Sequence, residues 1–227
     1  MKSISNPIAT LGKQKQAGFI QAALLFGIAL MTAVLGGFAL ANRSPTSQTD
    51  TEQAKVNASV ILKQASDLRD GVARFASDFG ASSVVGTLDF SSTASQGLFD
   101  PAARYASPQI MPTTAFAAGE DVTIKPPTAT SAGHWYINKV TPGNALGSAT
   151  VDPMVILPGL RQDVCGRVNT LLYGAPTIPA AGTDLSVWTT ATVDGAISGV
   201  AGVAGWPEGC ISTSDSKYVY FKAIQEN

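Results

Sequence analysis

Four groups of residues have side chains or spacings that could do chemistry. They are the two cysteines Cys165 and Cys210, the single histidine His134, the acidic pair Asp67 and Asp70, and the glycine-rich run Gly199–Trp206. The corresponding chemistries are a disulfide or metal site, a nucleophilic triad, a cation site and a phosphate loop.

The two cysteines are explained most simply as one disulfide, if the domain lies in an oxidising compartment. Two buried free thiols are the alternative. A bond between Cys165 and Cys210 closes a loop of about 46 residues, which contributes roughly 4 kcal/mol in the chain-entropy model. Two cysteines and one histidine do not supply the four ligands of a structural zinc site, so we expect no metal.

We expect structural roles for His134, for the acidic pair and for the glycine-rich run. A Ser/His/Asp triad would have to use His134, which lies in a predicted strand, so we expect a structural or surface role for it. Asp67 and Asp70 lie three residues apart on a predicted helix with arginines beside them, as on a solvated face. The run Gly199–Trp206 lacks the following Lys-Ser/Thr of a phosphate loop and is interpreted as a turn-rich linker to Cys210. We therefore expect neither an enzyme nor a bound cofactor.

The composition sets the broad class. Of 227 residues, 45% are hydrophobic and only 14% charged, which excludes disorder for most of the chain, and the formal net charge of −1 argues against a nucleic-acid partner. The charge is unevenly distributed: residues 1–44 carry four basic residues and no acid, whereas the remainder sums to −5.

This asymmetry coincides with an apolar segment, Phe19–Ala41, which has 23 residues and no charge. As a helix it is roughly 35 Å long, enough to cross a hydrocarbon core of about 30 Å. Because lysines precede it, the positive-inside rule places the N-terminus in the cytoplasm and the chain after Arg43 outside it.

The sequence KQKQAG-FIQAALL places Gly18 directly before Phe19, after a short basic leader. This junction resembles the cleavage site of type IV prepilins and pseudopilins, where a prepilin peptidase cuts on the cytoplasmic side and methylates the new N-terminal Phe. The resemblance implies a leader (1–18), a membrane and filament-core helix (19–44), an amphipathic helix (45–80) and an extracytoplasmic domain (81–227). It assigns helix-core assembly to these positions: Gln21, Ala23, Leu24, Phe26, Gly36, Gly37 and Pro45. Most family members carry a glutamate where this chain has Ala23, so the chain is atypical and lacks the usual subunit-docking carboxylate.

Two other processing routes fit the same segment. The helix can remain as an uncleaved anchor, or a signal peptidase can cut after the A-x-A pattern that ends at Ala41, although 23 residues is long for a signal-peptide core of about 7–15. Between the two expected helical halves, Gly36, Gly37 and Pro45 disfavour helix. We expect residues 36–45 either to become extended in an assembled filament, as in similar pilins, or to form a simple kink.

The rest of the chain predicts an α+β domain in which a long helix packs on a small antiparallel sheet. Ile61, Ala65, Leu68, Val72, Phe75 and Phe79 form one apolar stripe on a helix over residues 53–80, which Gly80 ends. The predicted strands are Asp121–Lys125, His134–Val140, Val151–Leu157, Leu185–Val193 and Tyr218–Ile224. A second helix is predicted at Leu160–Tyr173, with Leu160, Val164, Val168 and Leu171 on one face, and Ser91–Thr130 is predicted to be a long surface connection.

Within the resemblance, the runs around Cys165 and Cys210 look like the two ends of a disulfide-bridged pilin C-terminal loop. The implied function is a structural subunit of a type IV pilus-like or type II secretion-like filament. Its implied partners are copies of itself, other pilin-like subunits, the prepilin peptidase, an inner-membrane assembly platform and the membrane, before export into a filament. The rival hypothesis is a periplasmic binding domain on an uncleaved signal anchor, with a cleft in the sheet region. A secreted hydrolase is disfavoured by the single histidine.

Overall fold

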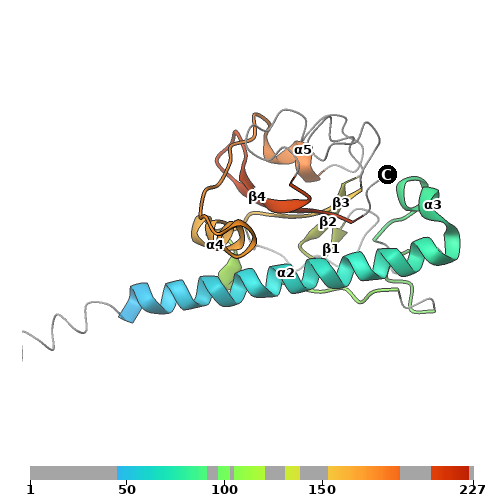
Figure 1. The fold of residues 1–227 in the computed structure, drawn as a ribbon, viewed down its shortest axis with the longest axis horizontal. Coiled ribbons are helices and arrows are strands. Elements are labelled where there is room, and N and C mark those ends of the chain that lie inside the picture. Colours follow the sequence, from blue (N-terminus) through green and yellow to red (C-terminus); the bar gives the residue numbers. More distant parts are fainter. Residues whose placement is uncertain are drawn as a thin grey trace, which may run out of the picture. The chain divides into compact units, whose positions relative to one another are not determined.

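The computed structural model describes residues 45–90, 97–102, 105–120, 131–138, 153–189 and 206–224. The chain divides into two compact units, residues 1–49 and 50–227. The described part confirms the α+β class, because a long helix packs against an antiparallel sheet (Figure 1). No helix in this part is both long enough and apolar enough to cross a membrane. The expected membrane helix, 19–44, lies outside the described residues.

The long helix is α2, Pro45–Phe79. Its first residue is a proline, whose missing N–H costs no intrahelical bond at that position. The predicted apolar stripe is buried from Ile61 to Phe75, but its last member, Phe79, is 38% exposed, contrary to prediction. The reason is that the helix ends there: Gly80 has φ 88°, and the chain turns into a short helix, α3 (Ala81–Gly86), which the sequence did not predict.

The sheet has five strands in the order β1-β2-β3-β5-β4, and all neighbouring pairs are antiparallel. The strands are β1 (Ser131–Ala132), β2 (Trp135–Asn138), β3 (Met154–Pro158), β4 (Glu208–Ser212) and β5 (Tyr218–Ala223). The C-terminal strand β5 thus lies inside the sheet, between β3 and β4. Predicted strands at β2, β3 and β5 are confirmed, whereas the predicted strand at 121–125 lies outside the described residues.

Side chains of the sheet alternate between two apolar layers, as the two-residue period of a strand requires. Trp135, Val155 and Tyr220 pack in the layer shared with α2. Ile156 and Phe221 belong to the opposite layer, against which Leu185 of α5 packs. In Figure 1, α2 and α5 accordingly lie on opposite sides of the sheet. Both faces of the sheet are therefore buried.

The two remaining helices agree only partly with the prediction. Helix α4 runs over Gln162–Tyr173, as expected, and ends at Gly174 with φ 77°. Its Leu171, however, is 48% exposed and does not join the buried face. The predicted strand at Leu185–Val193 is wrong for its described part, because Leu185–Thr189 form helix α5, and residues 190–193 lie outside the described residues. The missed signal is Asp184, whose carboxylate accepts the Ser186 N–H at 3.1 Å and begins the helix as an N-cap does.

Two further segments differ from the sequence prediction. The run that forms β4 contains Glu and Gly and shows no clear alternation, so the sequence does not predict it as a strand. The supposed surface connection Ser91–Thr130 is wrong for its described parts, because they contribute buried side chains and a short 3-10 helix, η1 (Thr113–Ala115). These side chains are Leu98, Phe99, Tyr105, Met111, Ala115 and Phe116.

Candidate functional site

The C-terminal part of the domain is joined by a disulfide between Cys165 of α4 and Cys210 of β4. The two Cα atoms lie 5.4 Å apart, and both residues are fully buried. The bond connects a helix to the outermost strand of the sheet, next to β5. It therefore fixes the edge of the sheet against the layer that holds α2.

A buried amide beside the disulfide was not identified from the sequence. Asn169 lies one turn after Cys165 and is fully buried. Its Oδ1 accepts the N–H of Cys210 at 2.8 Å, and its Nδ2 donates to the Cys210 carbonyl at 2.8 Å and to the Thr177 carbonyl at 2.7 Å. One side chain thus takes the place of a neighbouring strand for Cys210.

The rest of the outer edge of β4 is occupied as well. Ser212 N–H donates to the Pro179 carbonyl at 2.9 Å, and its carbonyl accepts the Ala181 N–H at 2.7 Å. At the other end of the strand, the Tyr173 hydroxyl donates to the Glu208 carbonyl. An exposed strand edge is a template for pairing with another chain. Side chains and backbone of the same chain close this edge, so β4 does not offer a free edge for strand addition.

A polar group lies between β4 and β5. The Glu208 carboxylate accepts the Tyr220 hydroxyl at 2.6 Å and pairs with the Lys222 ammonium at 2.9 Å, and both charged side chains are at least 85% buried. Burial, and next the negative charge of Glu208, raise the pKa of Tyr220 well above its usual range. This group is a paired interior cluster in which every charge has a partner, and it contains no unpaired nucleophile.

A second polar system holds residues 105–116, here called the strap, along α2. The strap runs antiparallel to the helix: the Tyr105 hydroxyl donates to Asp78 at 2.7 Å near the C-terminal end of α2, and Gln64 Nε2 donates to the Ile110 carbonyl at 3.3 Å near its middle. Gln64 also accepts the indole N–H of Trp135 at 2.9 Å, so one buried amide joins helix, strap and sheet. The strap lies so close to α2 that a Cβ on Gly71 would meet the Tyr105 carbonyl oxygen at 2.9 Å.

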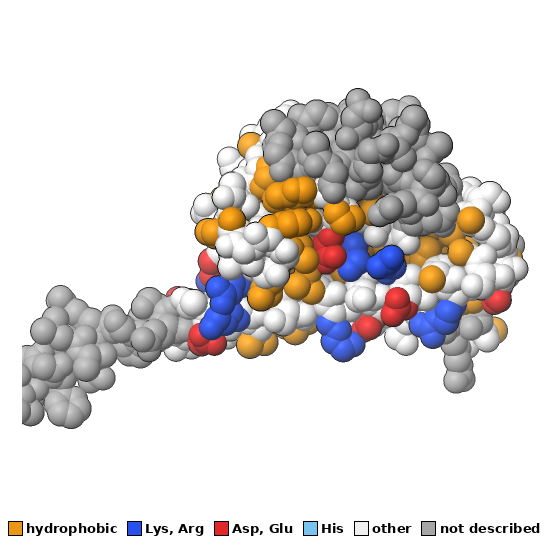
Figure 2. Space-filling model, viewed as in Figure 1, with side chains coloured by type: hydrophobic (Ala, Val, Ile, Leu, Met, Phe, Trp, Pro, Cys, Tyr) orange, Lys and Arg blue, Asp and Glu red, His pale blue; other side chains and the backbone are white. Residues whose placement is uncertain are grey.

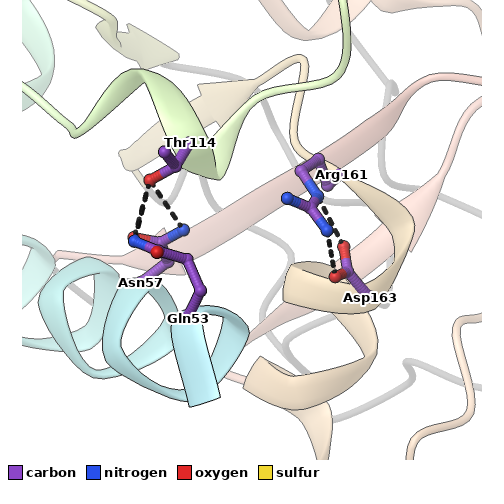
Figure 3. A network of polar contacts seen from close by, with 5 residues as sticks. All are labelled: Gln53, Asn57, Thr114, Arg161 and Asp163. Carbon is purple, nitrogen blue, oxygen red and sulfur yellow. Dashed lines mark hydrogen bonds and ion pairs between the residues drawn. The ribbon is translucent and has the colours of Figure 1, made fainter. Parts of the chain in front are cut away.

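Figure 3 shows the end of the strap, where α2, η1 and α4 meet. Gln53 and Asn57 of α2 both donate to the Thr114 hydroxyl, at 3.2 and 3.3 Å. On the α4 side, the Arg161 guanidinium pairs with the Asp163 carboxylate through contacts of 3.0 and 2.6 Å. The Arg161 N–H donates to the Ala115 carbonyl at 3.0 Å, which ties η1 to the start of α4.

Next to this junction is a groove of about 370 Å³. It lies between helix α4 and the part of α2 that begins at Asp50. The groove is lined by charged, polar and small apolar side chains: Asp50, Thr51, Ala54, Gln162, Asp163, Gly166, Arg167, Thr170, Pro176 and Ile178. The Nε of Arg167 is buried and has no hydrogen-bond partner among the described residues. The contacts at η1 hold both walls of the groove in place.

Between Glu52 and Asp78, the exposed surface of α2 is a stripe of mostly polar, charged and small side chains, here called the outer stripe. It consists of Glu52, Val56, Ser59, Lys63, Arg69, Asp70, Ala73, Arg74, Ser77 and Asp78. Figure 2 shows side chains of both charges interspersed where α2 runs, with a few apolar side chains among them and most of the apolar side chains above it. Lys63 pairs with Asp67 at 2.7 Å, and this contact, followed by the Gln109 amide of the strap, lowers the pKa of Asp67.

The residues singled out from the sequence are distributed as follows. Pro45 begins α2, and the other positions assigned to processing and helix-core assembly lie outside the described residues: Gly18, Phe19, Gln21, Ala23, Leu24, Phe26, Gly36 and Gly37. His134 is buried, with its ring centroid 4.4 Å from that of Phe116. Within the described ranges, no cluster of three or more His, Cys, Asp or Glu side chains is arranged to hold a metal ion.

Comparison of the chain with protein-family models, with curated proteins and with solved structures gave no match.

Proposed function

We propose that this chain is a structural subunit of a filament of the type IV pilus or type II secretion kind. The observation that carries the proposal is the junction of Gly18 and Phe19 at the start of an uncharged segment of 23 residues. An apolar helix that leaves the lipid must bury its surface again, and a bundle of such helices in a filament core does so.

The described domain supports the proposal by its architecture. The resemblance requires a helix that continues beyond the membrane segment and packs on an antiparallel sheet, and α2 packs in this way on the layer of Trp135, Val155 and Tyr220. It also implies a disulfide in the C-terminal part, and Cys165 and Cys210 are joined. The closed edge of β4 fits a subunit that assembles through helices rather than through its sheet.

The N-terminal sequence and intact mass of the protein from native membranes test the proposal. We expect a mature chain that begins at Phe19 and carries one extra methyl group. Gly18→Val should leave Met1 in place, whereas Ala41→Val should change nothing. A chain that begins at Asn42 and is sensitive to Ala41→Val would indicate a signal peptidase, and one that keeps Met1 would indicate a simple anchor; either result would refute the proposal.

The rival, a periplasmic binding domain on an uncleaved anchor, has one observation in its favour, the groove beside α4. Its cleft was expected in the sheet region, yet both faces of the described sheet carry buried apolar side chains. The groove lies between two helices, and its wall includes the start of the helix that follows the apolar segment. This position fits contact with another subunit better than capture of a small molecule.

A further inference from the structure

We propose that the groove between α2 and α4 receives the outer stripe of α2 from a second copy of this chain, with Arg167 paired to Asp70 of the second copy. The inference rests on the proposed filament function and names one of its subunit contacts. It follows from two unpaired charges of opposite sign and from the distance between them.

Arg167 is a cation of the groove without a direct partner. Its side chain is half-buried, its Nε is shielded from water, and its guanidinium makes no hydrogen bond or ion pair within the described part of the chain, although its charge, after the contact with Lys55, helps to lower the pKa of Glu52. By contrast, Arg161 pairs with Asp163 at the groove wall. An arriving carboxylate would pair with the terminal nitrogens of the guanidinium, which are not enclosed, through charge-assisted hydrogen bonds that are stronger than those between neutral groups.

Asp70 is the matching carboxylate. It is exposed on the outer stripe, and its carboxylate has no hydrogen bond or ion pair with any described residue. The other acidic side chains between Glu52 and Asp78 of α2 are engaged within the chain: Glu52 with Lys55, Asp67 with Lys63 and Gln109, and Asp78 with Tyr105. Asp70 is therefore the acid of the outer stripe that remains available to another molecule.

The surroundings of the two residues are also complementary. Asp50 in the groove takes part in no ion pair among the described residues, and neither do Arg69 and Arg74, which are exposed beside Asp70. The groove thus presents a cation next to an anion, and the stripe presents an anion between two cations. When the stripe docks with Asp70 on Arg167, one of these arginines faces Asp50. Such matched patterns favour one register over others.

The pair cannot form within one copy. Thr51 lines the groove, and Asp70 follows 19 residues later on the same helix, which places it about 28 Å further along the axis at 1.5 Å per residue. An ion pair needs contact within about 4 Å. Docking therefore joins two copies whose α2 helices are offset by about 28 Å along the axis, an offset that suits a staggered filament.

Charge reversal in the full-length protein tests the inference in its native host. Arg167→Glu and Asp70→Arg should each reduce the amount of filament sheared from cells by about tenfold or more, because each places like charges in contact. The double variant, which has the net charge of the wild type, should recover filaments to within about twofold. Normal protein levels and an intact Cys165–Cys210 bond in each single variant verify folding.

Each outcome decides the question. The inference is overturned if both single variants give the wild-type yield of filaments, or if the double variant is as defective as the single variants. In either case the proposed function stands as long as the wild-type chain begins at a methylated Phe19 and forms filaments. If the wild-type chain keeps Met1 and forms no filament, the proposed function fails and the inference fails with it. Direct contact between two copies is supported if both single variants lose filaments and the double variant recovers them.

Discussion

Replacing Asn169 with alanine should weaken the attachment of β4 to α4 more than any other single change at the edge of β4. The side chain is fully buried and makes three hydrogen bonds, two with the backbone of Cys210 and one with the carbonyl of Thr177. Truncation leaves one N–H and two carbonyl groups without their partner. At about 1–3 kcal/mol for each buried group, with water partly replacing the amide, we expect a loss of about 3–5 kcal/mol.

Urea denaturation of the full-length protein in detergent, followed by tryptophan fluorescence, measures this loss. With a slope of about 2 kcal/mol per M, the midpoint should fall by about 1.5–2.5 M. The matched control is Thr170→Ala at the neighbouring position, since the Thr170 hydroxyl donates only to the Gly166 carbonyl of its own helix at 2.8 Å. This control should cost less than about 1 kcal/mol.

The rate at which dithiothreitol reduces the disulfide gives a second measure that separates a local from a global effect. Both cysteines are fully buried, so a reductant reaches them only when β4 separates from α4. Asn169→Ala should accelerate reduction, because opening of this edge no longer breaks three hydrogen bonds. If stability falls by less than about 1 kcal/mol and the reduction rate does not change, the assignment of Asn169 as the closing partner of β4 is wrong.

Three further predictions address the other contacts. Gly71→Val should destabilise the domain by about 1–3 kcal/mol in thermal unfolding, because the new side chain would collide with the strap. The control Gly86→Ala should be nearly neutral, because a Cβ there meets nothing within 4 Å. Equal effects of the two changes would contradict the close approach of the strap to α2. Because the pKa of Tyr220 is raised in the folded state, stability should be complete below the ordinary tyrosine pKa and fall as the pH rises beyond it, and Tyr220→Phe should flatten that fall in unfolding measured from pH 8 to 11. Lys222→Met should cost about 3–5 kcal/mol because it strands the buried Glu208 carboxylate, and the added change Glu208→Gln should restore part of the loss in the same denaturation assay.

Periodic sequence patterns predicted the parts of the fold that are set by local burial. The stripe from Ile61 to Phe75 predicted α2, and the spacing of Val164 and Val168 predicted α4. The strand β5 was predicted because its aromatic and β-branched residues fit a pleated surface. These elements are amphipathic or apolar in their own sequence, so their neighbours did not have to be known.

The elements that the sequence missed depend on contacts with distant residues. Strand β4 contains Gly209, against which the Trp206 ring packs, and is held by pairing with β5, by the disulfide and by Asn169. Nothing local distinguishes Asn169 from an asparagine on a solvated helix, except that it follows Cys165 by one turn. The strap lacks periodicity because, apart from the short helix η1, it has no regular structure, and its buried side chains follow the surface of α2 instead.

The closed edge of β4 and the outer stripe of α2 together restrict how copies of this domain can associate. At β4 the backbone groups of Cys210 and Ser212 already have partners, so strand addition there would first have to break bonds within the chain. The helix surface, in contrast, keeps a charge without a partner at Asp70, about 28 Å along the axis from the groove in which Arg167 has no direct partner. Contact between copies through helices rather than through strands would leave the bonds that close β4 in place.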